Sequence, residues 1–259
     1  MNNTPKESQR YVTSLLKGLE VLEYIESNQP ASLQDMAERL DINKSRLMRL
    51  CGTLEYCGYI TRDVNKKYRL GNRAFSLGRS YENNSPVISI IKASLETIYK
   101  ELGQIVSFVV LSGRAMVCLA IIGDSDYMSR DYLATFDDFH VGVCGKIFLT
   151  FGPPELRSQF FSPSSETTYA SYTPNTITSQ DKLYESLQKI KNDGYCLSIE
   201  ERMIGAASLG VPVFNNLNTL VGVISLAGEK QFFAEDLVIN KYVPIMKDVA
   251  AKLRPKLLY

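Results

Sequence analysis

The first 58 residues hold three short stretches of helical periodicity, separated by breaks of only a few residues. Apolar residues recur at helical spacing in 12–27, 33–40 and 44–57. The second and third stretches are joined by the tripeptide 41–43, in which Ile42 is the one apolar residue, and Gly58 is well placed to end the third. Two short helices joined by so tight a turn are typical of a helix-turn-helix.

Local signals support this pattern. Ser32 precedes the second stretch as a helix N-cap, and Asp35 three residues later completes an acidic variant of a capping box. After the third stretch, 59–63 and 67–71 are predicted to form two strands around the turn 64–66. The first part of the chain is therefore predicted to be a winged helix-turn-helix.

The net charge of +1 conceals a strongly basic segment. Residues 41–80 contain nine Lys or Arg residues and three Asp or Glu residues, a balance of +6. Such a concentration of positive charge on a small domain is expected for a protein that binds a polyanion. A solvated charged face without a partner is the alternative that charge alone leaves open.

The amino-terminal residues of the second helix in a helix-turn-helix reach the base edges in the major groove. Arg and Asn suit guanine and adenine edges, whereas Lys and Ser suit phosphates. We therefore predict double-stranded promoter DNA as a partner, with a helical domain that mediates only protein contacts as the alternative. The predicted DNA-binding residues are Ser32, Asn43, Lys44, Ser45, Arg46, Arg49, Lys66, Lys67 and Tyr68.

Beyond a helical stretch at 73–103, the apolar spacing changes to that of strands. Strands are predicted at 105–111 and 115–123, joined by a hairpin signal at 112–114, and a third near 127–133. Three more are predicted at 195–200, 208–214 and 219–228, with helices at 144–151, 181–194 and 234–254. This order indicates an α+β fold with a central sheet of antiparallel type. The predicted domains are 1–72, a helical linker 73–86, and 87–259.

Scarce residue types argue against several chemistries. His140 is the single histidine, and the five cysteines form no C-x-x-C pair, so neither a metal site nor a cofactor is expected. No phosphate-binding loop or nucleophile-elbow motif is present. The longest apolar runs are about half the ~20 residues of a membrane-spanning helix, and the polar start lacks the apolar core of a signal peptide. We expect a cytoplasmic protein that is not an enzyme.

Two segments of the first part, 44-KSRLMRLCGTLEYCGYITRDVNKKYRLG-71 and 14-SLLKGLEVLEYI-25, resemble the winged helix-turn-helix of IclR-family transcriptional regulators. Runs in the second part resemble the effector-binding domain of that family, which has a GAF-like fold: 145–151, 173–183, 193–201, 205–215 and 221–228. The resemblance implies a regulator that assembles as a dimer or tetramer and whose operator binding responds to a small organic acid. It leaves open the operator, the effector, and whether transcription is repressed or activated.

The resemblance also implies an effector pocket between the sheet and the loop 142–146. Exposed N–H groups at a helix N-terminus attract anions, and Lys146 adds charge unless it faces solvent. Family members that bind small oxo-acids carry an aspartate, a cysteine and two serines where this chain has Ser198, Ser208, Ser225 and Ala227, so a different small organic acid is expected. Simple packing of these positions without a ligand is the alternative. The predicted effector-binding residues are Val143, Cys144, Ser198, Ala206, Ser208, Ser225 and Ala227.

Two further interpretations concern single residues. His140 has no catalytic partner in the sequence, so we expect it to make a structural hydrogen bond. Cys144 near a helix N-terminus raises the alternative of a GAF-like sensor or thiol enzyme without a DNA role, because thiol pKa values fall at such positions. No general base is evident beside Cys144, so this alternative ranks below the regulator.

Overall fold

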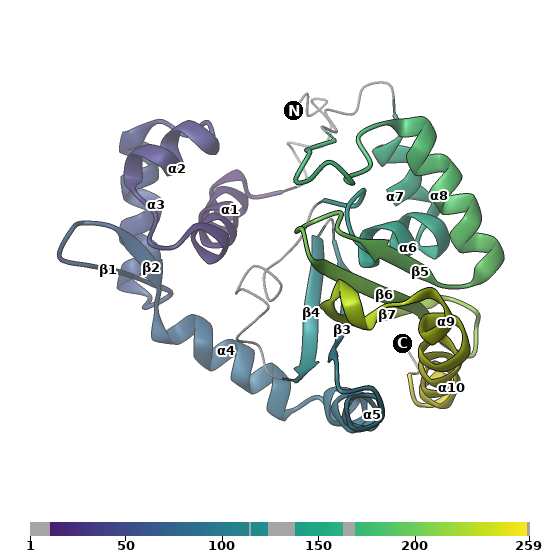
Figure 1. The fold of residues 1–259 in the computed structure, drawn as a ribbon. Helices are drawn as coiled ribbons and strands as arrows, with labels where there is room; N and C mark the ends of the chain where they lie inside the picture. Colours follow the sequence, from purple (N-terminus) through teal and green to yellow (C-terminus); the bar gives the residue numbers. More distant parts are fainter. Residues whose placement is uncertain (1–10, 114, 124–137, 163–168, 258–259) are drawn as a thin grey trace. The chain divides into compact units, whose positions relative to one another are not determined.

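A computed structural model of the chain describes residues 11–113, 115–123, 138–162 and 169–257. Its contacts divide the chain into two compact units, Met1–Ser85 and Pro86–Tyr259 (Figure 1). The division falls at the end of the helical stretch that the sequence suggested as a linker. Each unit has its own hydrophobic core.

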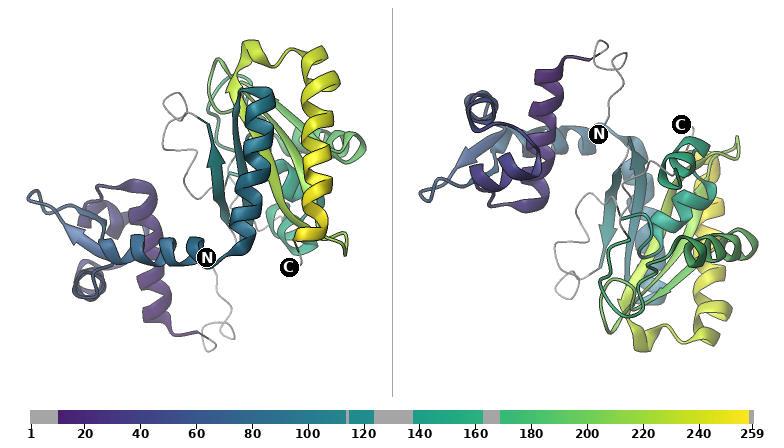
Figure 2. Two further views of the ribbon diagram at one scale, coloured as in Figure 1. Left: turned by 90° about the horizontal axis from the view of Figure 1, so that it is seen from below. Right: turned by 90° about the horizontal axis from the view of Figure 1, so that it is seen from above.

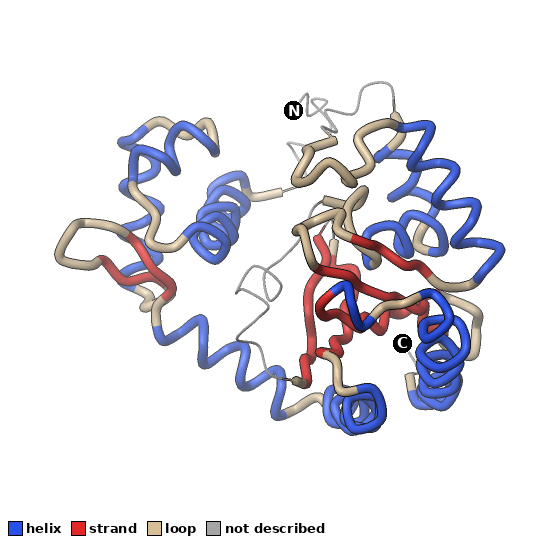
Figure 3. Tube along the Cα trace, viewed as in Figure 1, coloured by secondary structure: helices blue, strands red, loops and turns tan. Residues whose placement is uncertain are grey.

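The first unit contains the three predicted helices and the predicted hairpin. The helices are α1 (Thr13–Asn28), α2 (Leu33–Arg39) and α3 (Lys44–Tyr56). The antiparallel strands β1 (Ile60–Arg62) and β2 (Tyr68–Leu70) form the wing, and α4 (Asn72–Asn83) follows (Figure 3). The prediction of a helical helix-turn-helix domain is confirmed.

Capping and turn chemistry explain why these short helices form. The Ser32 hydroxyl accepts a hydrogen bond from the Asp35 N–H at 3.1 Å, as predicted for an N-cap. Asn43 caps α3 in the same way, by accepting from the Arg46 N–H at 2.8 Å. Gly58 ends the segment with φ 77°, a left-handed conformation that favours glycine. Ile42 anchors the turn and is only 5% exposed.

The second unit is built on a five-stranded antiparallel sheet with strand order β4-β3-β7-β6-β5. The strands are β3 (Ile105–Ser112), β4 (Ala115–Ile122), β5 (Cys196–Ile199), β6 (Ala206–Phe214) and β7 (Leu220–Glu229). The predicted α+β fold with an antiparallel sheet is therefore confirmed. The strand predicted near 127–133 lies outside the described residues.

Helices cover both faces of this sheet. Helix α5 (Pro86–Leu102) and helix α10 (Val243–Leu253) lie side by side on one face (Figure 2). Helix α6 (Cys144–Phe151) and helix α8 (Gln180–Asp193) pack together on the other face, and the short helix α7 (Pro154–Phe160) also contacts α6. The strand alternation therefore sends alternate side chains into two separate cores.

The last predicted helix, 234–254, is interrupted. It consists of α9 (Glu235–Leu237), a π-helical turn (Val238–Tyr242) and α10. Pro244 has no N–H to donate to the carbonyl group of Asn240, so regular α-helical bonding cannot continue through this turn. Short 3₁₀ turns occupy Lys230–Phe232 and Arg254–Lys256. Among the described helices, none combines the length and apolar character needed to cross a membrane.

Candidate DNA-binding face and effector site

The amino-terminal half of α3 presents an exposed basic face. Leu47 and Cys51 are fully buried and hold one side of the helix against the first unit's core. Lys44, Arg46 and Arg49 lie on the other side and are exposed, as Ser45 is. Within the described part of the chain, no ion pair involves these three cations. Their charge is therefore available to an external anion.

The wing carries a second group of exposed cations. Its turn is organised by Asp63, whose Oδ1 accepts from the N–H groups of Asn65 and Lys67, both at 2.9 Å. Lys66 adopts a left-handed conformation with φ 59°. Lys66 and Lys67 are both exposed at this turn, where sequence reasoning placed them.

Three predicted DNA-binding residues have structural roles. Tyr68 is only 4% exposed and belongs to the core, so its inclusion among the DNA-contacting side chains was wrong; the strand alternation turns it inward. Ser32 and Asn43 use their side-chain oxygens as helix caps. The Asn43 amide can still donate a hydrogen bond outward.

Sequence reasoning missed two exposed cations on the wing, Arg62 and Arg69. Arg62 lies over the Tyr68 ring at 5.4 Å and donates from Nε to the carbonyl group of Lys66 at 3.3 Å. Arg69 lies 3.9 Å from Asp63. The alternation of the strand 68–70 was the available signal for Arg69, because it turns Arg69 to the side opposite Tyr68, whereas Arg62 pairs with Tyr68 and lies on the same side as that ring.

In the second unit, α6 packs against the neighbouring strands β6 and β7. A Cβ at Gly210 would stand 2.9 Å from Cβ of Val143 and 2.8 Å from Cδ1 of Ile147, so the start of α6 rests directly on this glycine. Further along, the rings of Phe151 and Phe214 are 5.6 Å apart. The helix thus runs from Gly210 towards Phe214, and its N-terminus points the opposite way along β6.

Beyond the N-terminus of α6, the sheet carries a row of small side chains. On the sheet face shared with Gly210, Ser208 pairs with Ser198 on one side and with Ala227 on the other. Ala206 is the next residue of β6 on this face, and Ser225 pairs directly with Gly210. The structure therefore brings together the predicted effector-binding residues, which come from four separate segments: Val143, Cys144, Ser198, Ala206, Ser208, Ser225 and Ala227.

Two of these serines have hydroxyl groups without a partner. Ser198 is 4% exposed and Ser208 is 6% exposed, yet neither hydroxyl makes a hydrogen bond with the described residues. Since no fully enclosed side-chain oxygen in the described part lacks a partner, each of these two hydroxyls retains some accessible surface. The amides that open α6 add donors, because the first backbone hydrogen bond of this helix runs from Ile147 to Val143.

Lys146 does not face solvent, contrary to one alternative from the sequence. It is 1% exposed, and its Nζ lies 2.5 Å from Oε1 of Glu201. The second carboxylate oxygen, Oε2, accepts from the Gly142 N–H at 3.0 Å. Sequence reasoning missed Glu201 because it lies 55 residues from Lys146, and only the fold brings the two together.

Burial of Cys144 disfavours the thiolate form that acts as a nucleophile. Burial raises the pKa of its thiol to about 12, although a hydrogen bond with Ser225 acts in the opposite direction. Burial likewise raises the pKa of Cys118 and of Cys196 to about 11. The expectation that a helix N-terminus lowers the pKa of Cys144 was wrong, because desolvation of the thiolate outweighs the helix dipole.

His140 makes the predicted structural hydrogen bond. It is 1% exposed, its Nε2 lies 3.0 Å from the carbonyl oxygen of Ala170, and its ring meets Tyr169 edge-on. Across the described residues, no group of three or more His, Cys, Asp or Glu side chains is arranged to hold a metal ion.

Comparison with known proteins identifies the class. The family model for the IclR helix-turn-helix domain matches residues 14–64, and that for the bacterial transcriptional regulator IclR C-terminal domain matches residues 79–254. The chain therefore belongs to the IclR family of transcriptional regulators.

Individual relatives agree with this assignment. The chain is 24% identical to a probable HTH-type transcriptional regulator ArcR of Halobacterium salinarum, over 85% of this chain and 84% of the relative. It is similar in fold to an IclR transcriptional regulator from Alicyclobacillus acidocaldarius, with a TM-score of 0.77, 24% identity, and 94% and 98% of the two chains covered. A homologue from Microbacterium hydrocarbonoxydans, crystallised with 4-hydroxybenzoate, gives a TM-score of 0.68 at 18% identity, with 93% and 97% covered.

Proposed function

We propose that this regulator binds promoter DNA in the cytoplasm through α3 and the wing, and that a small organic acid bound at the N-terminus of α6 modulates this binding. The observation that carries the DNA proposal is a group of exposed cations at the start of α3, Lys44, Arg46 and Arg49, that form no ion pair with the described residues. The effector proposal is carried by the hydroxyls of Ser198 and Ser208, which make no hydrogen bond with the described residues and lie on the sheet face that α6 covers.

DNA binding predicts a steep dependence on salt. Each phosphate neutralised by Lys or Arg releases counterions, so the logarithm of the affinity falls linearly with the logarithm of the salt concentration. A titration of promoter DNA by fluorescence anisotropy at several salt concentrations measures this slope. A flat salt dependence would contradict the proposal.

The effector proposal rests on the chemistry of the site. The N-terminus of α6 favours a negatively charged group, and Ser198 and Ser208 offer hydroxyls that can bond a carbonyl, hydroxyl or carboxylate oxygen. Small organic acids combine these features, and 4-hydroxybenzoate is a suitable first compound because a homologue was crystallised with it. A thermal-shift screen of organic acids on the full chain tests the proposal, since a ligand at 100 times its Kd stabilises by about 2.7 kcal/mol.

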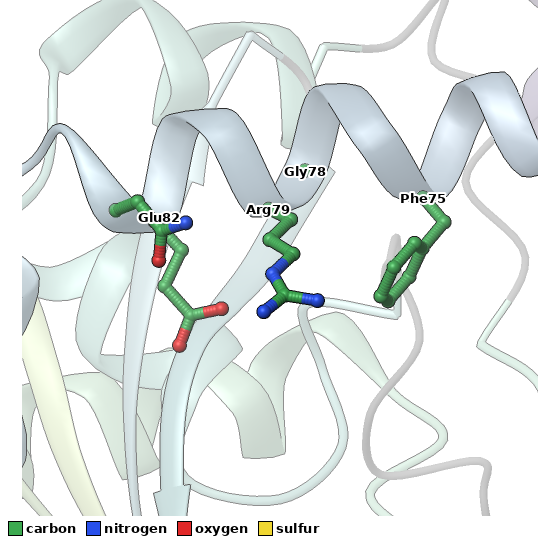
Figure 4. Close-up of a pocket in the computed structure, with 5 residues that line it drawn as sticks. Phe75, Gly78, Arg79 and Glu82 are labelled. Carbon is green, nitrogen blue, oxygen red and sulfur yellow. The ribbon is translucent and has the colours of Figure 1, made fainter.

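We also propose self-association through the first unit. Helix α4 has no buried residue, and Phe75, Leu77 and Tyr81 on it are 69%, 53% and 61% exposed. Figure 4 shows Phe75 at one end of a shallow hollow along this helix, with Arg79 and Glu82 beside it.

Helix α1 adds three more exposed apolar side chains, Leu15, Leu16 and Leu19. Large exposed apolar surfaces mark interaction sites, and helix-turn-helix dimers read two half-sites about one DNA turn apart. Analytical ultracentrifugation tests this: the wild type should be a dimer or tetramer, and Phe75→Ser with Tyr81→Ser should shift it towards monomer.

A thiol enzyme that uses Cys144 is not supported, because burial raises the pKa of this thiol to about 12. Cys144→Ser should therefore leave DNA binding intact. A loss of any turnover in this variant would instead revive the enzymatic alternative.

A further inference from the structure

Glu201 connects both walls of the candidate effector site. It follows β5, which carries Ser198, and its carboxylate reaches across to the loop before α6. Its own backbone is fixed as well, because the Thr176 hydroxyl donates to its carbonyl group at 2.6 Å. One side chain thus joins the sheet edge to the start of α6.

The start of α6 lacks the usual means of fixing a helix N-terminus. Its N-cap residue, Val143, has no side-chain oxygen and makes no side-chain cap. The nearest substitute is the bond from the Gly142 N–H to Oε2 of Glu201, at 3.0 Å. Gly142 itself has φ 71°, so the loop turns sharply at the residue that Glu201 holds.

The same carboxylate pairs with Lys146, a cation in the first turn of α6. Lys146 is 1% exposed and its Nζ lies 2.5 Å from Oε1 of Glu201. Among the described residues around Ser198 and Ser208, no other cationic side chain is buried. Of the positive charge that the described residues bury here, what remains for a ligand is the partial charge of the helix N-terminus, roughly half an elementary charge.

We propose that Glu201 is a positioning and specificity-determining residue of the effector site. By accepting a hydrogen bond from the Gly142 N–H, Glu201 holds the first amides of α6 close to Ser198 and Ser208 on the sheet. By pairing with Lys146, it limits the site to ligand groups with a single negative charge. The second part rests on the proposed function, whereas the first is independent of any effector.

Two double variants isolate the positioning role. Lys146→Met with Glu201→Gln removes both charges and keeps an acceptor for Gly142, whereas Lys146→Met with Glu201→Leu removes both charges and the acceptor. The readout is the alkylation rate of Cys144 by iodoacetamide in the full chain, measured by peptide-resolved mass spectrometry. Cys196, which is buried in the same core cluster, reports unfolding of the whole unit.

We expect Cys144 to react about fivefold faster in the Leu variant than in the Gln variant. Loss of one hydrogen bond makes local opening of this helix terminus more frequent by about that factor, and the thiol reacts in the open state. Cys196 should react equally slowly in both. Equal Cys144 rates in the two variants, or a parallel rise at Cys196, would overturn the positioning role.

A third variant tests the charge. Glu201→Gln alone keeps the acceptor and leaves Lys146 uncompensated, so inorganic phosphate should raise the Tm of this variant more than that of the wild type. The Lys146→Met, Glu201→Gln double variant should lose this gain. The specificity role is overturned if phosphate affects all three proteins equally. This experiment uses inorganic phosphate and no organic acid, so its outcome does not depend on the organic-acid screen. A failed screen would count against the proposed function but would leave the phosphate result on Glu201 valid.

Discussion

The N-termini of α3 and α6 carry the same kind of partial positive charge but differ in exposure, capping and ion pairing. Helix α3 begins at the surface, is capped by Asn43, and is surrounded by exposed cations without ion pairs in the described part of the chain. Helix α6 begins in the interior without a side-chain cap, and its one lysine is paired with a carboxylate. The positive end of a helix attracts anions in both places.

The difference follows from the anion that each terminus would meet. DNA is a large polyanion that stays in water, so exposed, unpaired cations gain affinity through counterion release. A small ligand in the interior offers little charge, and an unpaired buried lysine would cost several kcal/mol before any ligand arrived. Glu201 offsets that cost at α6, whereas α3 needs no such partner.

The largest expected effect is on stability and comes from removing the cation of the buried Lys146–Glu201 ion pair. Lys146→Met leaves Glu201 buried without its cation and should lower the free energy of unfolding by about 3–5 kcal/mol. Urea denaturation of the full chain measures this. The double variant with Glu201→Gln should recover most of the loss, and a loss below about 1 kcal/mol in the single variant would show that the pair contributes little.

The next largest expected effect is on operator affinity and concerns the exposed N-terminal half of α3. Arg49→Ala should weaken operator binding by roughly 1–3 kcal/mol, concentrated at one base position if the guanidinium reads a base, with little change in stability. Anisotropy titrations against single-base operator variants measure it. Lys252→Ala, which removes an exposed cation paired with Asp248, is the matched control and should leave affinity unchanged. Equal weakening on every sequence would place Arg49 on a phosphate.

A smaller effect separates capping from DNA contact. Asn43→Ala should lower the free energy of unfolding by about 1 kcal/mol through loss of the cap, whereas Asn43→Asp should retain the cap. The Asp variant should nevertheless bind DNA more weakly, because it adds negative charge beside the phosphates. Thermal melts and anisotropy together test this. Retained affinity in the Asp variant would place Asn43 away from DNA.

The smallest effect is expected in the serine row. Ser208→Ala should leave stability nearly unchanged, because its hydroxyl has no partner among the described residues, but should weaken binding of an organic-acid effector by about 0.5–1.5 kcal/mol. Calorimetric titration measures the affinity. Ser225→Ala is the comparison, since this hydroxyl bonds the Cys144 thiol and its loss should also reduce stability.

Much of the fold was predictable because its signals are local. Apolar spacing, the Ser32 cap, Gly58 and the hairpin turns act over a few residues, and the three helices and two strands of the first unit formed where they indicated. The interruption at Val238–Tyr242 was not anticipated, although Pro244 was visible. The seven predicted effector-binding positions were chosen through resemblance, since no local pattern relates Val143 to Ser208.

The sequence alone determined the class of the protein, the elements of its DNA-binding unit and the excess of cations there, because periodicity, capping and charge are properties of short segments. Tertiary structure decided which polar groups have partners. It turned Tyr68 into a core residue, paired Lys146 with Glu201 across 55 residues, and raised the pKa of Cys144 instead of lowering it. Burial and long-range pairing depend on how distant segments pack, and no short stretch of sequence contains that information.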